Sequence, residues 1–535
     1  MKHFFAKAAL VAFVTLGMGS VSTFAQQQVI AQQEGLSGVV TDASGYGVIG
    51  AGVIVKGTTT GTSTDVNGLF SLRGVQPGSV IVVSSIGYKP LEITWNGGSL
   101  NVVLEEDTEM LEETVVIGYG VQKKSVVSAS IAKVSSDDLK YVKKTRMDDV
   151  LKGLAAGVNV TSASGQPGSS PRITIRGNGT INNSNPLFLV DGMHIGGGID
   201  FLNPADIESI EVLKDAASAA IYGARAANGV VLVTTKKGSV GKTKVNYDFQ
   251  YGISNPWKKL EVLNATEYAL MINEMEFNSG KAAKFADPYS YGVGTDWQDY
   301  VFNKNAPQST HQISATGGTK NLNYYFSTSY QSQEGIVGGN YDRSNYERLS
   351  IRGNVNTIVF DATRERNYLN KLSVGINTSY ARINSRGITE NSEFGGPLGS
   401  AIALSPILSP FATEDETAAI LAATAAAGAN PIYDKISGKL LSIVDGVVYN
   451  EMNNPLADLS RPGARNDSDK IVGTATATLG IWDNLKFTTN FGYDLSFWGS
   501  QGYGFTYYMS SKNYRNTTEG YKSMNRSFVW QFENV

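Results

Sequence analysis

The segment KVNYDFQYGIS, residues 244–254, alternates apolar and polar side chains almost without exception. Successive side chains of a β-strand point to opposite faces. One face of this strand would therefore carry Val245, Tyr247, Phe249, Tyr251 and Ile253, and the other would carry polar residues and glycine. A single run of this kind is more typical of a half-buried strand in a soluble sheet, so the surrounding sequence decides the fold.

The same two-residue period recurs in residues 322–330, 372–380 and 485–497. Repetition favours strands that have lipid on one side and water or polar filling on the other. The connections at 318–320 and 482–484 are tight, whereas those at 254–309 and 383–469 are very long. Short turns at one end and long loops at the other are typical of an outer-membrane β-barrel, with the long loops outside.

The residues before the alternating strands indicate two other domains. Residues 121–238 mix α and β signals, with strands expected around Ile173, at 186–190 before an Asp191-Gly192 turn, at 207–213 and at 230–234, and a short helix at 216–222. Residues 36–104 predict a small β-sandwich with strands at 37–40, 52–57, 68–72, 79–85 and 100–104. Asn67-Gly68 and Pro77-Gly78 supply turn chemistry.

Between these domains lies LEETVVIGYG, residues 111–120, which follows an acidic stretch. Val115, Val116 and Ile117 favour an extended backbone. An extended segment can add itself as a strand to the edge of another protein's sheet. The alternative is that it forms only the first strand of the following domain.

Composition and the first residues indicate export. The chain has 535 residues, with 45 Lys+Arg against 48 Asp+Glu, so no strong field would attract nucleic acid. Residues 1–25 combine lysines, an apolar run and a Thr23-Phe24-Ala25 end, which predicts a signal peptide cleaved after Ala25. With no cysteine, the chain can form neither disulfides nor a thiolate metal site.

Residues that would support an enzyme are absent from the sequence pattern. The histidines are His3, His194 and His311, and neither of the last two has a second ligand at metal-site spacing. GSVGKT at 238–243 lacks the first glycine and the following helix of a phosphate loop. No catalytic residue, metal site or cofactor is therefore expected, and the weak calcium-like run at 65–68 is explained by a hairpin turn.

Taken in order, these segments resemble the N-terminal portion of a TonB-dependent outer-membrane transporter of the SusC/RagA family. Residues 111–125, LEETVVIGYGVQKKS, are similar to its TonB-box region, and NPADIESIEVLKDAASAAIYGARAANGVVLVTTKKG at 203–238 is similar to its plug with the greatest specificity. Residues 38–72 resemble a carboxypeptidase regulatory-like domain, a name that implies no peptidase activity. An additional signalling domain found in some relatives has no room here.

The resemblance and the patterns predict a mainly β fold: a small β-sandwich, an α+β plug domain and the first part of an antiparallel transmembrane β-barrel. The expected boundaries are 1–25 for the signal peptide, 26–35 for a linker, 36–105 for the regulatory-like sandwich, 106–120 for the acidic linker and TonB box, 121–240 for the plug and 241–535 for an incomplete barrel. Seven clear strands, and two more near Thr506 and Ser527, make about half of a 22-stranded barrel. We therefore expect a truncated transporter, the alternative being a split protein completed by a second chain.

By resemblance, the implied function is active import of an oligosaccharide or peptide across the bacterial outer membrane. The implied partners are TonB, energised by ExbB/ExbD and the proton gradient, a SusD-like surface lipoprotein and outer-membrane lipid, without nucleic acid. A surface receptor or adhesin that binds without transport is the alternative, and an exported peptidase is disfavoured. The expected TonB-binding residues are Glu112, Glu113, Thr114, Val115, Val116, Ile117, Gly118 and Tyr119, and the candidate ligand-binding aromatics are Tyr289, Tyr291, Trp297 and Tyr300.

Overall fold

The computed structural model describes residues 35–42, 45–85, 88–105, 114–117, 120–123, 131–140, 146–162, 164–180, 184–215, 219–363, 365–390, 392, 396–445, 448–449 and 451–535. The predicted signal peptide, the linker up to residue 34, and residues 106–113 lie outside the described residues. The chain divides into two compact units, Met1–Glu113 and Thr114–Val535, which are described separately.

The first unit is a β-sandwich. One sheet has the order β4-β1-β7 and the other β3-β2-β5-β6. The strands are β1 (Leu36–Asp42), β2 (Gly52–Val55), β3 (Gly61–Ser63), β4 (Leu69–Leu72), β5 (Ser79–Ser84), β6 (Leu91–Trp95) and β7 (Leu100–Leu104). Buried Val40, Val53, Ile81, Val83 and Leu104 belong to its apolar core.

Five of these strands agree with the sequence analysis, and β3 and β6 were missed. β3 is short and polar, and β6 is only five residues long although its residues LEITW alternate apolar and polar side chains. Both are stabilised by pairing instead, β3 with β2 and β6 with β5. Gly68 turns the expected Asn67-Gly68 hairpin with a φ of 77°, a conformation that glycine adopts without steric cost.

The second unit begins with a hairpin and the plug. Strand β8 (Thr114–Ile117) pairs with β9 (Gly120–Lys123), and a five-stranded sheet of order β10-β15-β16-β13-β14 follows. The plug elements are β10 (Ile131–Ser135), α1 (Ser136–Lys140), α2 (Met147–Val150), β11 (Val158–Thr161), β12 (Arg172–Ile175), β13 (Leu187–Val190), β14 (Met193–Ile195), η2 (Pro204–Asp206), β15 (Ile207–Leu213), η3 (Ala220–Ala226) and β16 (Val230–Thr235). The helix expected at 216–222 is found instead as the 3-10 segment η3, and residues 216–218 lie outside the described part of the chain.

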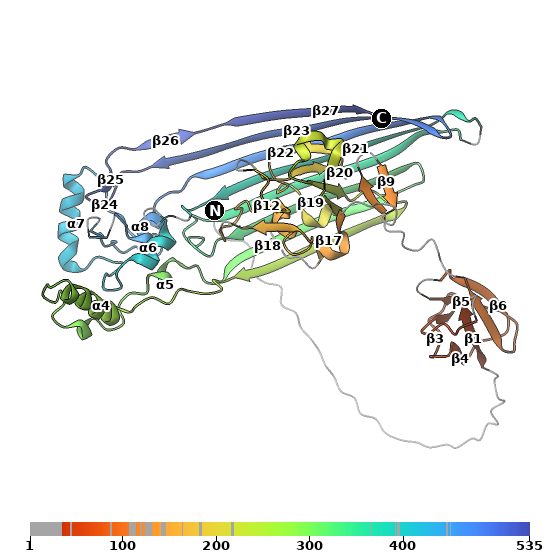
Figure 1. The fold of residues 1–535 in the computed structure, drawn as a ribbon, viewed down its shortest axis with the longest axis horizontal. Coiled ribbons are helices and arrows are strands. Elements are labelled where there is room, and N and C mark those ends of the chain that lie inside the picture. Colours follow the sequence, from red (N-terminus) through yellow and green to blue (C-terminus); the bar gives the residue numbers. More distant parts are fainter. Residues whose placement is uncertain are drawn as a thin grey trace, which may run out of the picture. The chain divides into compact units, whose positions relative to one another are not determined.

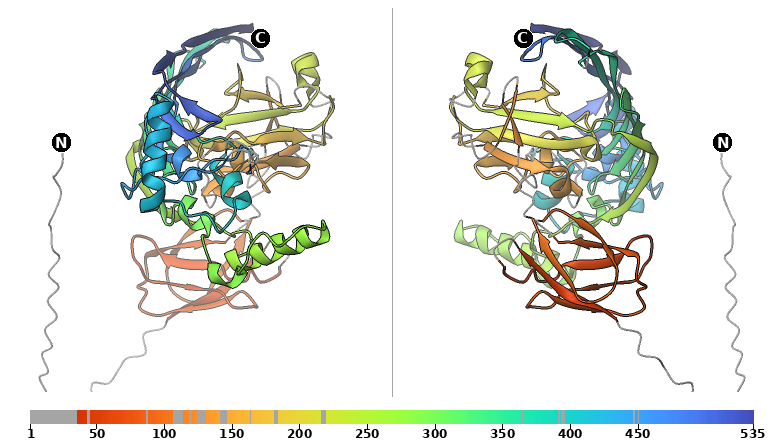
Figure 2. Two further views of the ribbon diagram at one scale, coloured as in Figure 1. Left: turned by 90° about the vertical axis from the view of Figure 1, so that its left-hand side faces the viewer. Right: turned by 90° about the vertical axis from the view of Figure 1, so that its right-hand side faces the viewer.

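A nine-stranded antiparallel sheet curves around the plug (Figure 1, Figure 2). Its strands are β17 (Gly241–Ser254), β18 (Ala306–Gly318), β19 (Leu322–Glu334), β20 (Asn345–Asp361), β21 (Tyr368–Arg386), β22 (Arg465–Trp482), β23 (Leu485–Gly504), β26 (Glu519–Lys522) and β27 (Asn525–Asn534). Neighbours in sequence pair with each other, and β26 and β27 pair with successive parts of β23. The sheet does not close into a complete barrel in the described residues.

The alternation predicted at 244–254 appears in the exposure of residues 250–254, whereas residues 244–249 are exposed on both faces. Val245, Tyr247, Phe249, Tyr251 and Ile253 are all exposed on the outer face of β17. On the inner face of the sheet, polar residues are buried against the plug. We call the nine-stranded sheet of β17–β23, β26 and β27 the barrel wall. The segment expected near Thr506 is not a strand of that wall. It forms β24 (Tyr507–Ser510), which pairs only with β25 (Asn513–Arg515), because these residues fold into a hairpin within a long loop.

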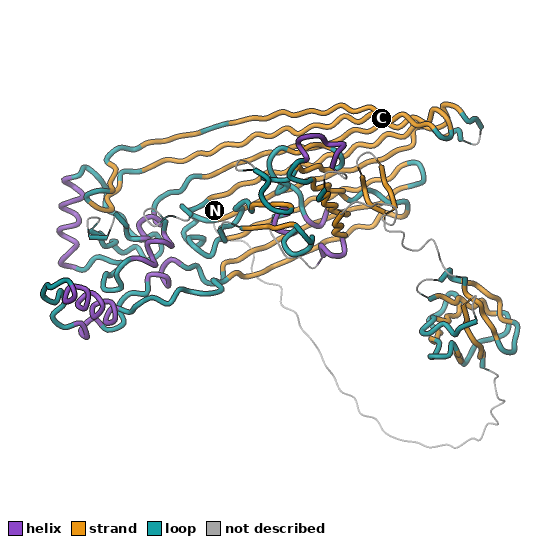
Figure 3. Tube along the Cα trace, viewed as in Figure 1, coloured by secondary structure: helices purple, strands orange, loops and turns teal. Residues whose placement is uncertain are grey.

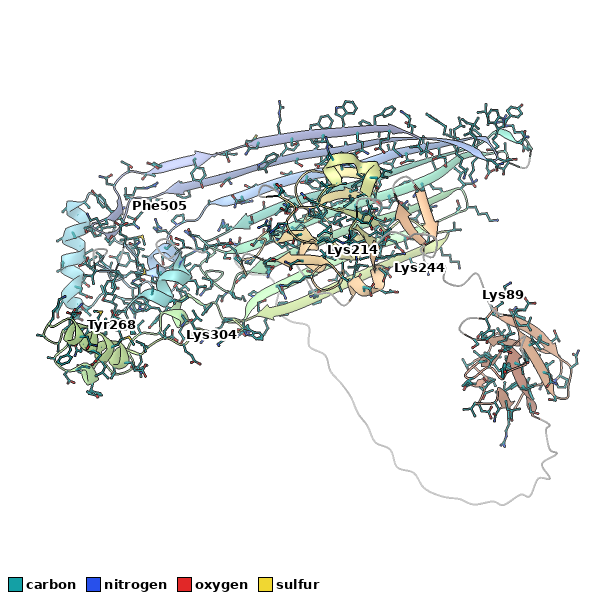
Figure 4. The ribbon with its side chains drawn as sticks, viewed as in Figure 1. Lys89, Lys214, Lys244, Tyr268, Lys304 and Phe505 are labelled. Atoms are coloured by element: carbon teal, nitrogen blue, oxygen red, sulfur yellow. The ribbon has the colours of Figure 1, made fainter. Side chains whose placement is uncertain are left out.

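The helices of the long connections gather at one end of the sheet, and the tight turns lie at the other (Figure 3). The helices of the long connections are α4 (Ala265–Asn278), η4 (Pro288–Tyr291), α5 (Trp297–Val301), α6 (Pro397–Ala403), α7 (Glu414–Ala426) and α8 (Pro455–Ser460). We call the connections at this end the outer loops. Tyr268 and Phe505, labelled in Figure 4, both lie there. No helix in the described part of the chain is long and apolar enough to cross a membrane.

Candidate functional site

The first polar contact between plug and barrel wall is centred on Asp191. Asp191 has a φ of 48° and occupies the expected Asp191-Gly192 turn between β13 and β14. Its carboxylate accepts hydrogen bonds from the amide of Thr235 at 2.9 Å and from the hydroxyl of Thr235 at 2.6 Å. The wall residue Asn377 donates to the same carboxylate. Arg352 of β20 donates to Thr235 and, at 3.0 Å, to Asn377, so the turn is held by two wall strands.

A second contact is centred on Asp206, in the 3-10 segment η2. Gln312 of β18 donates to the Asp206 carboxylate at 3.0 Å, and the Tyr325 hydroxyl of β19 donates to it at 2.8 Å. Asn203, which also caps η2, donates to Gln312 at 3.0 Å. All four side chains are buried. Buried polar groups are stable only when they are paired, so this geometry holds η2 against the wall.

Backbone groups of the plug supply further partners. The ammonium group of Lys470 on β22 lies 2.8 Å from the carbonyl oxygen of Gly196 and 3.3 Å from the carboxylate of Asp494. The Gly196 amide donates to Asp494 at 3.2 Å. Arg348 of β20 donates at 2.6 Å to the carbonyl oxygen of Asp200. Together with the Asp191 and Asp206 contacts, these bonds form what we call the plug-wall interface.

The type of contact in the plug-wall interface determines how easily the plug can separate from the wall. The plug has its own apolar core, which includes Val134, Leu151, Phe188, Ile210 and Val233. The contacts just described are hydrogen bonds, which contribute about 0.5–1.5 kcal/mol each, or about 1.5–3 kcal/mol when one partner is charged. Water can replace such bonds when they break. The same apolar cluster also contains Ala381 and Val472 of the wall. A pulling force that separates plug from wall therefore breaks mainly hydrogen bonds and exposes only the part of the core that these two residues cover.

A cavity of about 800 Å³ lies between the plug and β17, and part of β18 lines it. Its lining is largely polar and includes Asp248, Gln250, Thr310 and Ser314 from the wall and Lys236 from the plug. The plug therefore adjoins an open space, lined mostly by polar side chains, along these two strands. The plug is bound to the wall by the side chains of β18–β23 described above.

The outer loops share an apolar core of their own. Trp297, Leu404, Leu441, Leu456 and Met509 belong to it, and they come from three different loops. The indole nitrogen of Trp297 donates at 3.0 Å to the carbonyl oxygen of Ser405. These loops are therefore packed structure rather than slack chain.

The four candidate ligand-binding aromatics do not lie together in one pocket wall. Trp297 is only 2% exposed, so its ring cannot stack on a ligand in this structure. Tyr300 packs edge-on against Phe411, and Tyr291 packs edge-on against Phe285. Tyr289 is the most accessible of the four, with 73% of its surface exposed.

A carboxylate and a phenol bridge two of the outer loops. The hydroxyl of Tyr341 donates to Asp434 at 2.7 Å, and Ser437 donates its amide to the same carboxylate at 2.7 Å. Burial by itself would raise the pKa of Asp434, but hydrogen bonds from Ser437, Tyr341 and the backbone lower it on balance. Burial and the neighbouring Asp434 raise the pKa of Tyr341, which therefore keeps its proton.

Half of the expected TonB-binding segment can be placed. Thr114, Val115, Val116 and Ile117 form β8, whereas Glu112, Glu113, Gly118 and Tyr119 lie outside the described residues. β8 pairs with β9 in a two-stranded sheet, and no other described strand pairs with β8. An edge of β8 is thus open to strand addition as far as the described strands are concerned. Among the residues that the structure describes, no group of three or more metal-ligating side chains is found.

Sequence reasoning missed Asp206, Gln312, Tyr325, Arg352 and Asn377 as functional residues. A usable signal was present: Arg348 and Arg352 fall on the same, inner face of β20, where a charged side chain must meet a partner. The sequence did not show which residues Arg348 and Arg352 contact, because those residues lie in a different domain.

The comparisons with known proteins agree with this architecture. Residues 123–230 match the TonB-dependent Receptor Plug Domain family, and residues 36–116 match the CarboxypepD_reg-like domain family. The TonB-dependent receptor SusC of Bacteroides thetaiotaomicron is 38% identical over 416 residues, which cover 75% of this chain and 39% of SusC. The TonB-dependent receptor P26 of Formosa agariphila is 38% identical over 387 residues, which cover 71% of this chain and 37% of P26.

Among solved structures, the RagAB peptide transporter matches with a TM-score of 0.59 and 25% identity, over 76% of this chain and 45% of that chain. The RagAB peptide importer in its open-open state matches with a TM-score of 0.57 and 26% identity, over 79% of this chain and 46% of that chain. The chain thus spans less than half the length of these relatives.

A plug held inside an antiparallel sheet with short turns at one end and long loops at the other defines a TonB-dependent receptor. Within that class, the chain belongs to the SusC/RagA family, and it carries a regulatory-like domain followed by a plug domain. This is an outer-membrane family. The relatives are described as receptors and transporters rather than enzymes, so the expectation that the chain is not an enzyme is confirmed by what it resembles.

Proposed function

We propose that the protein is exported to the bacterial outer membrane, after cleavage of residues 1–25, and imports a nutrient there. The regulatory-like sandwich at 36–105 precedes the acidic linker and TonB segment at 106–120, the plug at 121–240 and the wall from 241 onward. Cargo binds on the outer side of the plug and the outer loops, and TonB then pulls on the segment before the plug. Energy comes from the proton gradient through ExbB/ExbD.

The observation that carries this proposal is the plug-wall interface. A plug that only sealed the barrel would be held best by apolar packing, whereas the Asp191 and Asp206 contacts are hydrogen bonds that water can replace. The cavity beside β17 and β18 gives the plug space into which it can rearrange. RagAB is described as a peptide transporter, which supports cargo of the peptide class. The oligosaccharide class rests on the family resemblance alone.

The TonB segment provides the experiment that tests active import. Proline at Val116 removes a backbone donor that strand addition needs, and it also disrupts β8. We expect Val116→Pro in the intact protein to abolish cargo uptake by cells while leaving cargo binding at the cell surface nearly unchanged. The matched control is Val116→Thr, which keeps the donor and a β-branched side chain. Undiminished uptake by the proline variant would favour a receptor or adhesin that binds without transport.

A SusD-like surface lipoprotein is the proposed partner of the outer loops. Their shared core gives them a fixed surface, and α7 presents Leu421 with 42% of its surface exposed. The intact protein isolated from native membranes should therefore carry a lipoprotein in near-equal amount. Leu421→Asp should weaken that recovery, whereas Ala422→Asp on the same helix should weaken it less. Full transport by a preparation without a companion protein would exclude the partner.

A further inference from the structure

One loop of the plug bonds directly to the outer loops. It follows β11, and we call its residues 164–171 the plug loop. The side-chain oxygen of Gln166 in this loop accepts a hydrogen bond from the amide of Ile388 at 2.7 Å, and its side-chain nitrogen donates to the carboxylate of Glu390 at 2.7 Å. Both partners lie in the connection between β21 and α6. We call these two bonds the Gln166 link.

On the plug side, the link is fixed to the body of the plug. The carbonyl oxygen of Gly168 accepts a hydrogen bond from Arg146 at 2.9 Å. The buried Arg146 also forms an ion pair of 3.2 Å with Asp200, farther along the plug. Gly168 lies so close to the ring of Tyr346 on β20 that a Cβ at this position would overlap the ring. The plug loop therefore keeps its place only while the plug is seated against the wall.

On the other side, the link reaches the apolar core of the outer loops. The side chain of Ile388 packs against this core, which contains Trp297 and Leu404, while its backbone amide is bonded to Gln166. The chain then continues into α6, and Ala401 of this helix is buried in the same core. Ile388 therefore connects the plug loop directly to the packed interior of the outer loops.

Gly387 permits the close approach of the two segments. A Cβ at this position would lie 2.6 Å from the side-chain nitrogen of Gln166, which is closer than these atoms can approach without a shift. The φ angle of Gly387 is not positive, so alanine can adopt the same backbone conformation. The added methyl group would instead displace the end of the flexible Gln166 side chain. Gly387→Ala therefore breaks the Gln166 link without removing either of its bonding partners.

A contact shared by two parts of a protein couples their movements, and the coupling acts equally in both directions. If the outer loops rearrange, Gln166 loses the amide of Ile388 and the carboxylate of Glu390 together. If the plug moves, Ile388 and Glu390 lose their partner. Hydrogen bonds to a charged group are among the stronger ones in proteins, so the loss of the Glu390 bond weighs most.

We propose that Gln166 is a positioning residue that couples the plug to the outer loops, so that displacement of either one loosens the other. The proposal rests on the proposed function, in which cargo binds the outer loops and TonB pulls the plug. A plug that is pulled from its place breaks the Gln166 link, and the outer loops lose this support at the step when cargo must leave them. Release of cargo is thereby synchronised with movement of the plug.

The test is a double-variant cycle on the intact protein in detergent, without cargo or TonB. Hydrogen exchange is followed by mass spectrometry in two fragments, residues 164–171 of the plug loop and residues 397–404 of the outer loops. Gln166→Ala should speed exchange of the 397–404 fragment about tenfold. Ile388→Ala keeps its amide but removes its side chain from the outer-loop core, and it should speed exchange of the 164–171 fragment. In the double variant, exchange of 164–171 should be no faster than in Gln166→Ala alone, because the link is already broken.

Two further variants separate the link from a general loss of stability. Gly387→Ala should speed exchange of the 397–404 fragment as Gln166→Ala does, although it removes no bonding group. Ser170→Ala changes an exposed position of the same plug loop and should alter neither fragment. Exchange of residues 36–42, in the separate first unit, is the internal reference and should stay constant in every variant.

Unchanged exchange of the 397–404 fragment in both Gln166→Ala and Gly387→Ala would overturn the proposal. An additive cycle would also overturn it: if Ile388→Ala speeds exchange of 164–171 by the same factor with and without Gln166, the two segments are coupled through other contacts. Because the assay contains neither cargo nor TonB, its result does not depend on whether the protein transports. A failure of uptake with the coupling intact would count against the proposed function alone.

Discussion

The hydroxyl of Tyr325, on wall strand β19, donates a hydrogen bond of 2.8 Å to the carboxylate of the plug residue Asp206. The two side chains are 5% and 3% exposed. They belong to different domains and are 119 positions apart in the chain. This contact fixes η2 of the plug to the wall at one point.

Replacing Tyr325 with phenylalanine should loosen η2. The change removes one donor to a buried carboxylate, which costs about 1–3 kcal/mol, while the bond from Gln312 remains. Amide hydrogen exchange of residues 204–206 should become correspondingly faster. Tyr324→Phe, which removes an exposed hydroxyl contact with Thr243, should leave that exchange unchanged. Equal protection in both variants would mean that the Tyr325 bond does not hold the plug.

Replacing Asn377 with leucine should weaken the contact at Asp191. Asn377 donates to Asp191 and accepts from Arg352, so its loss leaves the buried Arg352 and the partly buried Asp191 with fewer partners, at a cost of about 2–4 kcal/mol. The plug should then open spontaneously, and the outer membrane should become permeable to a large antibiotic such as vancomycin. Thr378→Val, on the outer face of the same strand, is the control. A tight membrane with Asn377→Leu would show that the contact is dispensable.

The aromatic residues of the first outer loop should separate into two classes. Trp297→Ala should cost about 3–5 kcal/mol of loop stability, because it removes a buried ring from the loop core, and the loops should become sensitive to protease. Tyr289→Ala should leave protease resistance unchanged and should weaken cargo binding if this tyrosine contacts the cargo. Binding that is unaffected by Tyr289→Ala would remove it from the site.

The hydrogen bond between Tyr341 and Asp434 should keep the outer loops stable until the pH falls below about 4. The pKa of Asp434 is lowered in the folded loops, so its stabilising effect is present above the unfolded pKa, near 3.8, and is lost as pH falls through the lower folded value. Loop protection measured by hydrogen exchange should therefore be constant at neutral pH and fall below about pH 4. Tyr341→Phe removes one of the stabilising hydrogen bonds and should move this decline to higher pH.

Export predicts the first residue of the mature protein. Because small residues occupy positions 23 and 25 and a polar run follows, cleavage should occur after Ala25. N-terminal sequencing of protein from an outer-membrane fraction should begin at Gln26. A start at Met1 in that fraction would contradict the signal-peptide prediction.

Local patterns in the sequence were enough to predict most strands and the order of the domains. The two-residue period at 244–254 correctly predicted the strand β17, and its apolar side chains are exposed, because alternation is a property of each strand by itself. Helix α4 was missed, although Asn264 and Glu267 have the spacing of a capping box that the structure confirms. Its apolar residues do not concentrate on one face, so periodicity gave no signal.

What the sequence determined by itself is therefore the fold: strands with two unlike faces, a plug before them and a sandwich before the plug. Only the tertiary structure decided which polar side chains meet, as in the pairs Asp206 with Tyr325 and Asp191 with Asn377. The physical reason is that strand pairing sets these contacts, and a shift of one residue in register would move every side chain to the opposite face. The burial of Trp297 has the same origin, because the residues that cover it come from loops far apart in the chain.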